Sequence, residues 1–293
     1  MSNIPISFRS SSLTSFESCP RMFGAKWLVD NKLAGQFAPD LRPTKQNVGA
    51  AVGSAVHAGH AFLMDALKNS GNHGTEQRKH HAVDVARAEL DKIMTGQPII
   101  VDNTCKNALA ADHAVAKIMA QMYLDYRPDV EPLMVERGFK AIWRYKRGGV
   151  EQQVRITGTI DLYLLDETLP DLKTGRWRPA PYAQLGTYRN LLELRGYPVR
   201  DLHARYYKRV SAGTQQPAAE IIPIDKEEAT AHAKLTACTA HRDMSRTLKT
   251  GSPVHLMARY DHPLCDPRFC PAFGTSFCSI GKTAHPERVN NAR

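Results

Sequence analysis

The sequence predicts an α/β (α+β) fold in which a mixed central sheet is flanked by helices. Three observations support this prediction. Residues 1–130 carry mostly helical apolar periodicity, residues 131–225 contain runs that alternate like strands, and residues 226–293 combine a charged helix with a cysteine-rich tail. A chain of 293 residues, 42% of them hydrophobic, can bury a core without disulfides. We therefore expect a single domain over residues 1–293.

The N-terminal part is expected to be helical. Apolar residues recur with a helical period in four segments, which are residues 10–30, 48–70, 78–95 and 105–126. A Ser or Thr at the start of the first segment, with Glu17 three residues after Thr14, is typical of a capped helix N-terminus. The polar, proline-containing residues 31–47 predict a loop.

The middle of the chain changes to strand periodicity. Residues 133–145 and 153–165 alternate like strands, and Gly148-Gly149 between them predicts a hairpin turn. A short loop at residues 166–170 should lead into a strand that opens with Asp171. The remaining expected elements are a helix over 180–195, strands over 199–210 and 218–224, and a helix over 225–249.

The charge balance favours a polyanionic partner. The chain has 39 basic and 29 acidic residues, a net charge of +10 and a pI near 9.4. Lys and Arg side chains release counterions from phosphate backbones, so nucleic acid is one such partner. No apolar run approaches the roughly 18 residues of a membrane span, and the N-terminus lacks the layout of a signal peptide. We therefore expect a cytoplasmic protein with no membrane partner.

The candidate catalytic residues lie in the segment GTIDLYLLDETLPDLKTG. Asp161 ends one alternating run, while Asp171 and Lys173 open the next and, two residues apart, point to one face of a strand. If the two strands form a hairpin, the two carboxylates converge. Carboxylates hold a hard divalent cation that polarises a phosphate, and a lysine can orient water or neutralise developing charge. The alternative is a set of solvated charges on an ordinary hairpin.

This segment resembles the RecB-type branch of the PD-(D/E)xK nucleases, in which G-x-I-D precedes a D-x-K-T-G strand. Three other segments agree in the expected order. Cys19-Pro20 ends the pattern S-x-L-x-x-F-x-x-C-P, Gly53 and His57 form G-x-x-x-H, and Gln184 and Tyr188 form Q-x-x-x-Y. The resemblance covers residues 11–190 and implies a restriction-endonuclease-like domain that cleaves DNA with a divalent metal.

The resemblance also implies roles for these residues. Asp161, Asp171, the Leu172 carbonyl and His57 would hold Mg²⁺ or Mn²⁺, with Lys173 as the catalytic lysine. An imidazole ligand makes the site compatible with Mn²⁺ as well as Mg²⁺. Without the resemblance, a lone histidine in a helix rich in small residues would be read as an ordinary packed or exposed side chain.

Two further features concern the surroundings of the lysine. Gln184 and Tyr188 share one helix face; the resemblance puts Gln184 near Lys173 or the DNA backbone and Tyr188 against the strand. The alternative is a helix that packs its tyrosine on the sheet. In relatives several apolar residues precede the D-x-K motif, whereas here only Leu169 and Pro170 do, and a proline is confined to an edge or to the start of a strand.

The cysteines predict a second metal site. The six are Cys19, Cys105, Cys238, Cys265, Cys270 and Cys278. The last three lie close together in the tail. Disulfide bonds between them are unlikely in a reducing cytoplasm, so the pattern indicates a metal site, with Cys19 as the fourth ligand. This layout resembles iron–sulfur nucleases such as the AddB-type helicase–nuclease subunit, the CRISPR-adaptation nucleases and phage RecB-like exonucleases. The resemblance favours a [4Fe–4S] cluster over zinc. The alternative is four reduced core cysteines; Cys105 and Cys238, on predicted helices, should simply pack.

Three segments interleave cations with aromatic residues: residues 143–147, 176–178 and 205–209. Such segments can bind phosphates and stack the bases of a single strand. The alternative is that each is an amphipathic strand with solvated charges.

Together the sequence predicts a metal-dependent DNA exonuclease for recombination, repair or replication, acting on single- or double-stranded ends. It would reside in a bacterial cytoplasm, or in the host cytoplasm if phage-encoded. The chain has no G-x-x-x-x-G-K-[ST] motif, so a helicase would be a separate partner, as would a single-strand-binding protein or recombinase. One alternative is a non-catalytic or partner-dependent iron–sulfur DNA-binding protein on a nuclease scaffold. Another is an iron–sulfur or zinc protein that acts on RNA or senses redox state.

Overall fold

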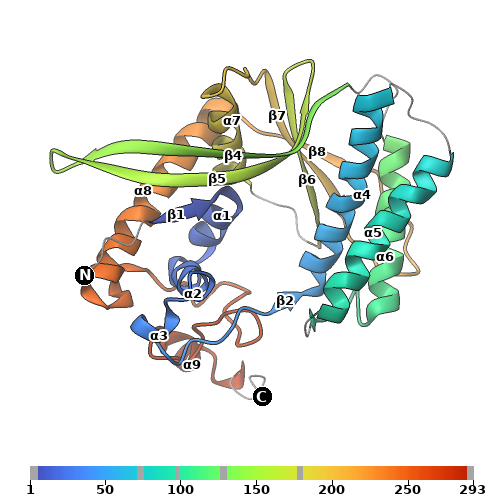
Figure 1. The fold of residues 1–293 in the computed structure, drawn as a ribbon. Helices are drawn as coiled ribbons and strands as arrows, with labels where there is room; N and C mark the ends of the chain where they lie inside the picture. Colours follow the sequence, from blue (N-terminus) through green and yellow to red (C-terminus); the bar gives the residue numbers. More distant parts are fainter. Residues whose placement is uncertain (1–5, 71–75, 97–98, 126–130, 177–180, 289–293) are drawn as a thin grey trace.

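Two small mixed sheets lie at the centre of the protein, whose computed structural model describes residues 6–70, 76–96, 99–125, 131–176 and 181–288. The first sheet has the order β1-β5-β4 and the second the order β6-β7-β8. Helices lie on both sides of the pair of sheets, with α1, α7 and α8 on one side and α4, α5 and α6 on the other (Figure 1). The predicted α/β class is confirmed, and the expected central sheet is divided into two three-stranded parts.

The first sheet is dominated by a long hairpin. β4 (Pro132–Arg147) and β5 (Val150–Leu164) pair antiparallel through the turn at Gly148 and Gly149, both of which have positive φ. β1 (Ser7–Arg9), which the sequence analysis missed, pairs parallel to β5. The hairpin's loop end lies on the far side of the molecule from helices α4, α5 and α6 (Figure 1).

The second sheet carries the D-x-K motif on an edge strand. β6 (Thr168–Gly175) pairs parallel to β7 (Asp201–Lys208), which pairs antiparallel to β8 (Glu220–Pro223). The predicted hairpin ladder between the Asp161 strand and the Asp171 strand is therefore wrong. The physical reason is the crossover helix α7 (Tyr182–Glu193), which returns the chain parallel to β6 and gives that strand a different partner.

Proline at an edge agrees with this topology. Pro170 lies within β6, whose one neighbour in the sheet is β7. On the other side of β6 no strand of this sheet needs a hydrogen bond from the N–H that proline lacks. The strand begins at Thr168, earlier than the sequence predicted, because Leu169 and Pro170 are themselves buried in the sheet.

The helices form two groups around the sheets. α4 (Val48–Ser70), α5 (Glu76–Gly96) and α6 (Ala108–Asp125) pack together on one side (Figure 1). On the other side α7 packs closely on α8 (Lys226–Thr250), where a Cβ at Gly186 would lie 1.9 Å from the Ala229 carbonyl oxygen. These helices match the predicted ranges to within a few residues.

The first predicted helix is interrupted. α1 (Ser10–Ser18) and α2 (Pro20–Asp30) are separated at Cys19, whose backbone is extended at φ −160°. Pro20 starts the second helix because its fixed φ suits the first helical position. The predicted Ser/Thr cap is wrong: Arg9 precedes α1 without a side-chain cap, and Cys19 caps α2 by accepting from the Met22 N–H.

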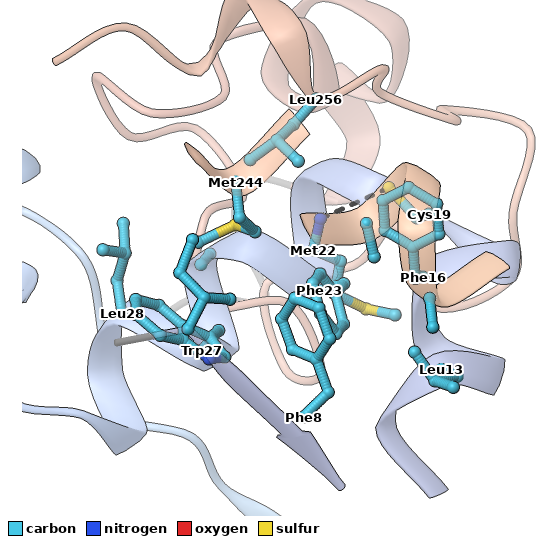
Figure 2. Packing of buried hydrophobic residues seen from close by; sticks show 14 of the residues in the cluster. Phe8, Leu13, Phe16, Cys19, Met22, Phe23, Trp27, Leu28, Met244 and Leu256 are labelled. Atoms are coloured by element: carbon cyan, nitrogen blue, oxygen red, sulfur yellow. Dashed lines mark hydrogen bonds between the residues drawn. The ribbon is translucent and has the colours of Figure 1, made fainter. Parts of the chain in front are cut away.

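An apolar core joins these helices to the C-terminal part of the chain. Phe8, Phe16 and Phe23 pack edge to face, and Met244 and Leu256 close the cluster from the other end of the sequence (Figure 2). The burial of this cluster brings residue 19 close to the tail, which consists of turns with the short helices η1 (Pro253–His255) and α9 (Ile280–Ala284).

Short elements also occur where a loop was predicted. The segment 31–47 contains α3 (Ala34–Phe37) and β2 (Gln46–Asn47), and β2 pairs parallel to β3 (Ile99–Ile100). Cys105 is buried in the turn before α6 and not on a helix, whereas Cys238 lies on α8 as predicted. In the described part of the chain, no helix is both long and apolar enough to cross a membrane.

Candidate active site

Three side chains from three elements converge where the hairpin meets α4. The His57 Nδ1 lies 3.3 Å from an Asp161 oxygen and 3.6 Å from a Glu136 oxygen. Within the residues that the structure describes, this is the one group of three His, Cys, Asp or Glu ligand atoms lying within 4.8 Å of one another. One imidazole and two carboxylates are a suitable donor set for a divalent cation.

Glu136 was missed by the sequence analysis, where it looked like an ordinary exposed position of an alternating strand. Its backbone has a positive φ of 44°, which is uncommon for a residue other than glycine. The neighbouring pairs Val135–Leu162 and Arg137–Ile160 place it opposite Asp161. Counting the hairpin register back from the Gly148-Gly149 turn would have identified it.

The D-x-K strand brings a third carboxylate to this place. Asp171 is 1% exposed, and its Oδ2 lies 2.5 Å from the Lys173 ammonium, so the two side chains do share one face of β6. The backbone N–H of Leu172 donates to Asp161 Oδ2 at 2.9 Å. Asp161 and Asp171 therefore lie together despite the absence of a ladder between their strands. The predicted role of the Leu172 carbonyl as a ligand stays a prediction.

The pKa values of these groups reflect both their burial and the charges of their neighbours. Desolvation raises the pKa of Asp171 to about 6, against the opposing attraction of Lys173. Burial would lower the pKa of His57, but the charge of Asp161 and hydrogen bonds to Asp161 and Glu136 raise it to about 10. Burial would raise the pKa of Asp161, yet His57, Lys173 and the Leu172 N–H together lower it. A bound cation would replace the proton of His57 and neutralise the clustered carboxylates.

Gln184 and Tyr188 project from α7 toward the same carboxylates. The Gln184 amide donates to the Tyr188 hydroxyl at 2.8 Å and lies 3.5 Å from Asp171 Oδ1. Tyr188 is buried, and its ring fills the space beside Gly158, where a Cβ would lie 2.7 Å from the ring. Gln184 thus contacts Asp171, and Tyr188 packs against the first sheet, as the packing interpretation expected.

A model of one protein family matches residues 8–272 of the chain, under the description PD-(D/E)XK nuclease superfamily. The chain belongs to this superfamily. The match extends well beyond the segment that carries the quoted motifs. Members of the superfamily typically use divalent metals. No curated protein matches the sequence at a significant level.

Solved structures give fold-level likenesses only. A Eubacterium rectale protein assigned as an exonuclease is 12% identical; the alignment covers 85% of this chain and 83% of that chain at a TM-score of 0.45. The protein SSO0001 is 13% identical, with 63% and 73% covered and a TM-score of 0.26. The family assignment rests on the family model alone.

The four cysteines of the predicted second site line one pocket of this PD-(D/E)XK nuclease. Cys19, Cys265, Cys270 and Cys278 all border it, and the remaining two cysteines do not. Cys19 Sγ accepts from the backbone N–H groups of Met22 and Arg259, each at 3.5 Å. Figure 2 shows Cys19 at the end of the apolar core, between Phe16 and Met22.

The surroundings of Cys265 and Cys270 favour the neutral thiol in the absence of a metal. Burial, reinforced by the charges of neighbouring cysteines, raises the pKa of Cys265 to about 11. Burial likewise raises the pKa of Cys270 to about 12. Arg21 lies next to the pocket and holds the tail by donating to the carbonyls of Leu256 (2.6 Å) and Phe277 (2.8 Å). A bound metal would supply the positive charge that four thiolates require.

The aromatic residues of the cation-rich segments are not placed to stack bases. Trp143, Tyr206 and Tyr207 are buried. The Tyr145 hydroxyl forms a hydrogen bond of 2.8 Å with Nδ1 of His241. On β4 alternation sends Trp143 and Tyr145 to one face and Arg144 and Lys146 to the other. On β7 the adjacent Tyr206 and Tyr207 lie on opposite faces, and each is buried in a different core cluster. The stacking interpretation of residues 143–147 and 205–209 is therefore wrong; Trp177 and Arg178 lie outside the described residues.

We expect the affinity for Mn²⁺ to increase as pH rises from 6.5 to 8. In this range His57, with a pKa of about 10, is protonated, while Asp171, with a pKa of about 6, is mostly ionised. Because one proton must leave His57 for each bound ion, affinity should rise about tenfold per pH unit. Titration calorimetry of the wild-type protein, without DNA, measures this. Asp161→Asn should remove binding, and Glu151→Gln on the same hairpin should not. An affinity independent of pH would contradict the assignment.

Proposed function

We propose that this nuclease is a DNA exonuclease that hydrolyses phosphodiester bonds with Mg²⁺ or Mn²⁺. The observation that carries the proposal is the convergence of His57, Glu136 and Asp161 beside the buried Asp171–Lys173 pair. Carboxylates, an imidazole and an ammonium at one point supply both a cation site and a positive charge for a phosphate. A metal ion with a purely structural role would not require the lysine.

His57, Asp161, Asp171 and the Leu172 carbonyl would hold the catalytic ion, with Glu136 as an added oxygen donor. A divalent ion held there would supply polarisation of the phosphate and activation of a water. Burial of Asp171 and the raised pKa of its carboxyl support a ligand role, because a buried carboxylate needs a compensating cation.

Lys173 and α7 act around the phosphate. The Lys173 ammonium, held by Asp171, stabilises negative charge on the phosphate oxygens while a water oxygen bonds to phosphorus. The bond from phosphorus to the leaving oxygen breaks, and that oxygen takes up a proton. Gln184 is a positioning residue: its amide bridges Asp171 and Tyr188 and so fixes the carboxylate relative to α7.

The biological setting that we propose is recombination, repair or replication. The substrates are single- or double-stranded DNA ends, which the net charge of +10 suits. The ordered motifs support a place in the RecB-like branch, and a helicase, single-strand-binding protein or recombinase would then act beside this chain.

We also propose that the cysteine pocket holds a [4Fe–4S] cluster, with zinc as the alternative. Four cysteines around one pocket support a metal. Four thiolates suit either an iron–sulfur cluster or zinc, and the resemblance of the cysteine layout to iron–sulfur nucleases favours the cluster. The cluster would tie residue 19 to the tail.

Lys173→Ala should lower DNA hydrolysis about 100-fold or more, since removal of one charge-stabilising donor commonly costs that much. The assay uses end-labelled linear single- and double-stranded DNA and a closed circle, with Mn²⁺ or Mg²⁺. Lys249→Ala, at an exposed position on α8, is the matched control and should keep full activity.

Loss of label from linear DNA with an intact circle supports an exonuclease, and cutting of the circle supports an endonuclease. Absence of hydrolysis in the wild type, with Mn²⁺ bound, would overturn the proposal and favour a DNA-binding or partner-dependent role.

Protein purified without oxygen should contain about four iron atoms and four sulfide ions per chain. Cys19→Ser and Cys270→Ser should lower both contents sharply, while Cys238→Ser, outside the pocket, should not. Iron and acid-labile sulfide analysis measures the outcome. One zinc without sulfide would replace the cluster by the zinc alternative, and the absence of both would leave four core thiols.

A further inference from the structure

The long hairpin has one face packed on helices and one face open. Val154, Ile156 and Trp143 on the packed face are buried in the core that α1 and α8 share. Every second residue lies on the other face, from Lys140 to Lys146 on β4 and from Glu151 to Thr159 on β5. These residues are mostly exposed. Such alternation leaves the second face free for a partner.

The open face bears a row of cations. Its basic residues are Arg9, Lys140, Arg144, Lys146 and Arg155, all exposed. Arg9 belongs to this face because it pairs with Thr157, and Lys140 pairs with the same residue from the other side. Of the five, only Arg144 has a carboxylate within 4.0 Å among the described residues, the exposed Glu151 at 3.6 Å.

This row leads to the candidate active site. Asp161 lies on the same face of β5 as Thr157 and Thr159, and its side chain contacts His57 on α4. The side chain of Ile160 lies on the opposite face of β5, in the apolar core. Gln153, beside Arg144, precedes Asp161 by eight residues, which is roughly 27 Å along an antiparallel strand. At its base the row thus ends at the candidate metal ligands Glu136 and Asp161.

We propose that this face, the hairpin track, binds the backbone of a single nucleic-acid strand along its length and delivers that strand to the site. The track is defined by Arg9, Lys140, Arg144, Lys146 and Arg155. Its width is two to three strands, about 5–10 Å, which suits one line of phosphates better than a broad duplex contact. The absence of stacking aromatics on this face makes the recognition electrostatic and independent of sequence. The inference rests on the proposed function for the identity of the polyanion.

The track makes hydrolysis depend on substrate length. At the stacked rise of about 3.4 Å per nucleotide, a strand needs about eight nucleotides to reach from the site to Arg144. Lys140 is nearer, since it pairs with Thr157, four residues or roughly 14 Å from Asp161. A two-nucleotide substrate therefore occupies the site without reaching the track cations, and a twenty-nucleotide substrate reaches them. Removal of the track cations should therefore affect the long substrate and spare the short one.

The test compares two triple variants with the same loss of charge. Lys140→Gln, Arg144→Gln and Arg155→Gln alter the track, while Lys234→Gln, Arg246→Gln and Lys249→Gln alter exposed positions of α8. Both are made with Lys173→Ala for binding, measured by fluorescence anisotropy of a twenty-nucleotide single strand over a series of NaCl concentrations without divalent metal.

The slope of log affinity against log salt should become shallower by about 2 in the track variant, because each lost contact to a single-strand phosphate removes about 0.7. The α8 variant should keep the wild-type slope. Equal slopes in the two variants would overturn the track.

The same substitutions with Lys173 intact are then assayed for hydrolysis. The track variant should be slower on the twenty-nucleotide strand and equal to wild type on the two-nucleotide substrate. Equal slowing on both lengths would overturn the track as a delivery surface. If no variant hydrolyses DNA but the salt slopes still differ, the proposed nuclease activity fails and the track stands.

Discussion

The N–H of Leu172 donates to the Asp161 carboxylate at 2.9 Å, and this bond joins two strands that share no ladder. Asp161 is 7% exposed, and a carboxylate buried to that degree needs compensation. The compensation comes from His57, from the charge of Lys173 and from this N–H. The contacts that make burial tolerable are therefore the contacts that assemble the candidate site. Removing one partner would leave a buried charge uncompensated, which is costly in a protein interior.

Close backbone approaches make this assembly possible. A Cβ at Gly53 on α4 would lie 3.1 Å from the Thr174 hydroxyl, so the glycine of G-x-x-x-H lets the His57 helix approach the D-x-K-T-G strand. At Gly158 the missing Cβ leaves room for Tyr188, which in turn holds Gln184 beside Asp171. The spacing of the motifs thus reflects packing between elements as much as it reflects chemistry at the phosphate.

Local pattern was enough to predict the α/β class, the long helices and the β4–β5 hairpin, because period and turn residues agreed over long segments. It also identified Asp161 and Asp171, whereas His57 was identified through the family resemblance; the structure brings all three together. Long-range pairing was not readable from the sequence. The parallel return through α7 moved β6 out of the expected hairpin. The position of Glu136 depends on the hairpin register, which alternation alone does not fix but the Gly148-Gly149 turn does. Similarly, interleaved aromatics and cations resembled a stacking surface, but Trp143, Tyr206 and Tyr207 are buried in the core.

The central claim is that His57, Glu136 and Asp161, with Asp171 beside them, form one divalent-metal site. Anomalous diffraction from crystals of the full chain soaked in Mn²⁺ tests it most directly, because manganese is located independently of the protein atoms. We predict one strong peak within bonding distance of Asp161 and of at least one other member of this group. A strong peak elsewhere, or no peak at this place with Mn²⁺ in large excess, would contradict the account.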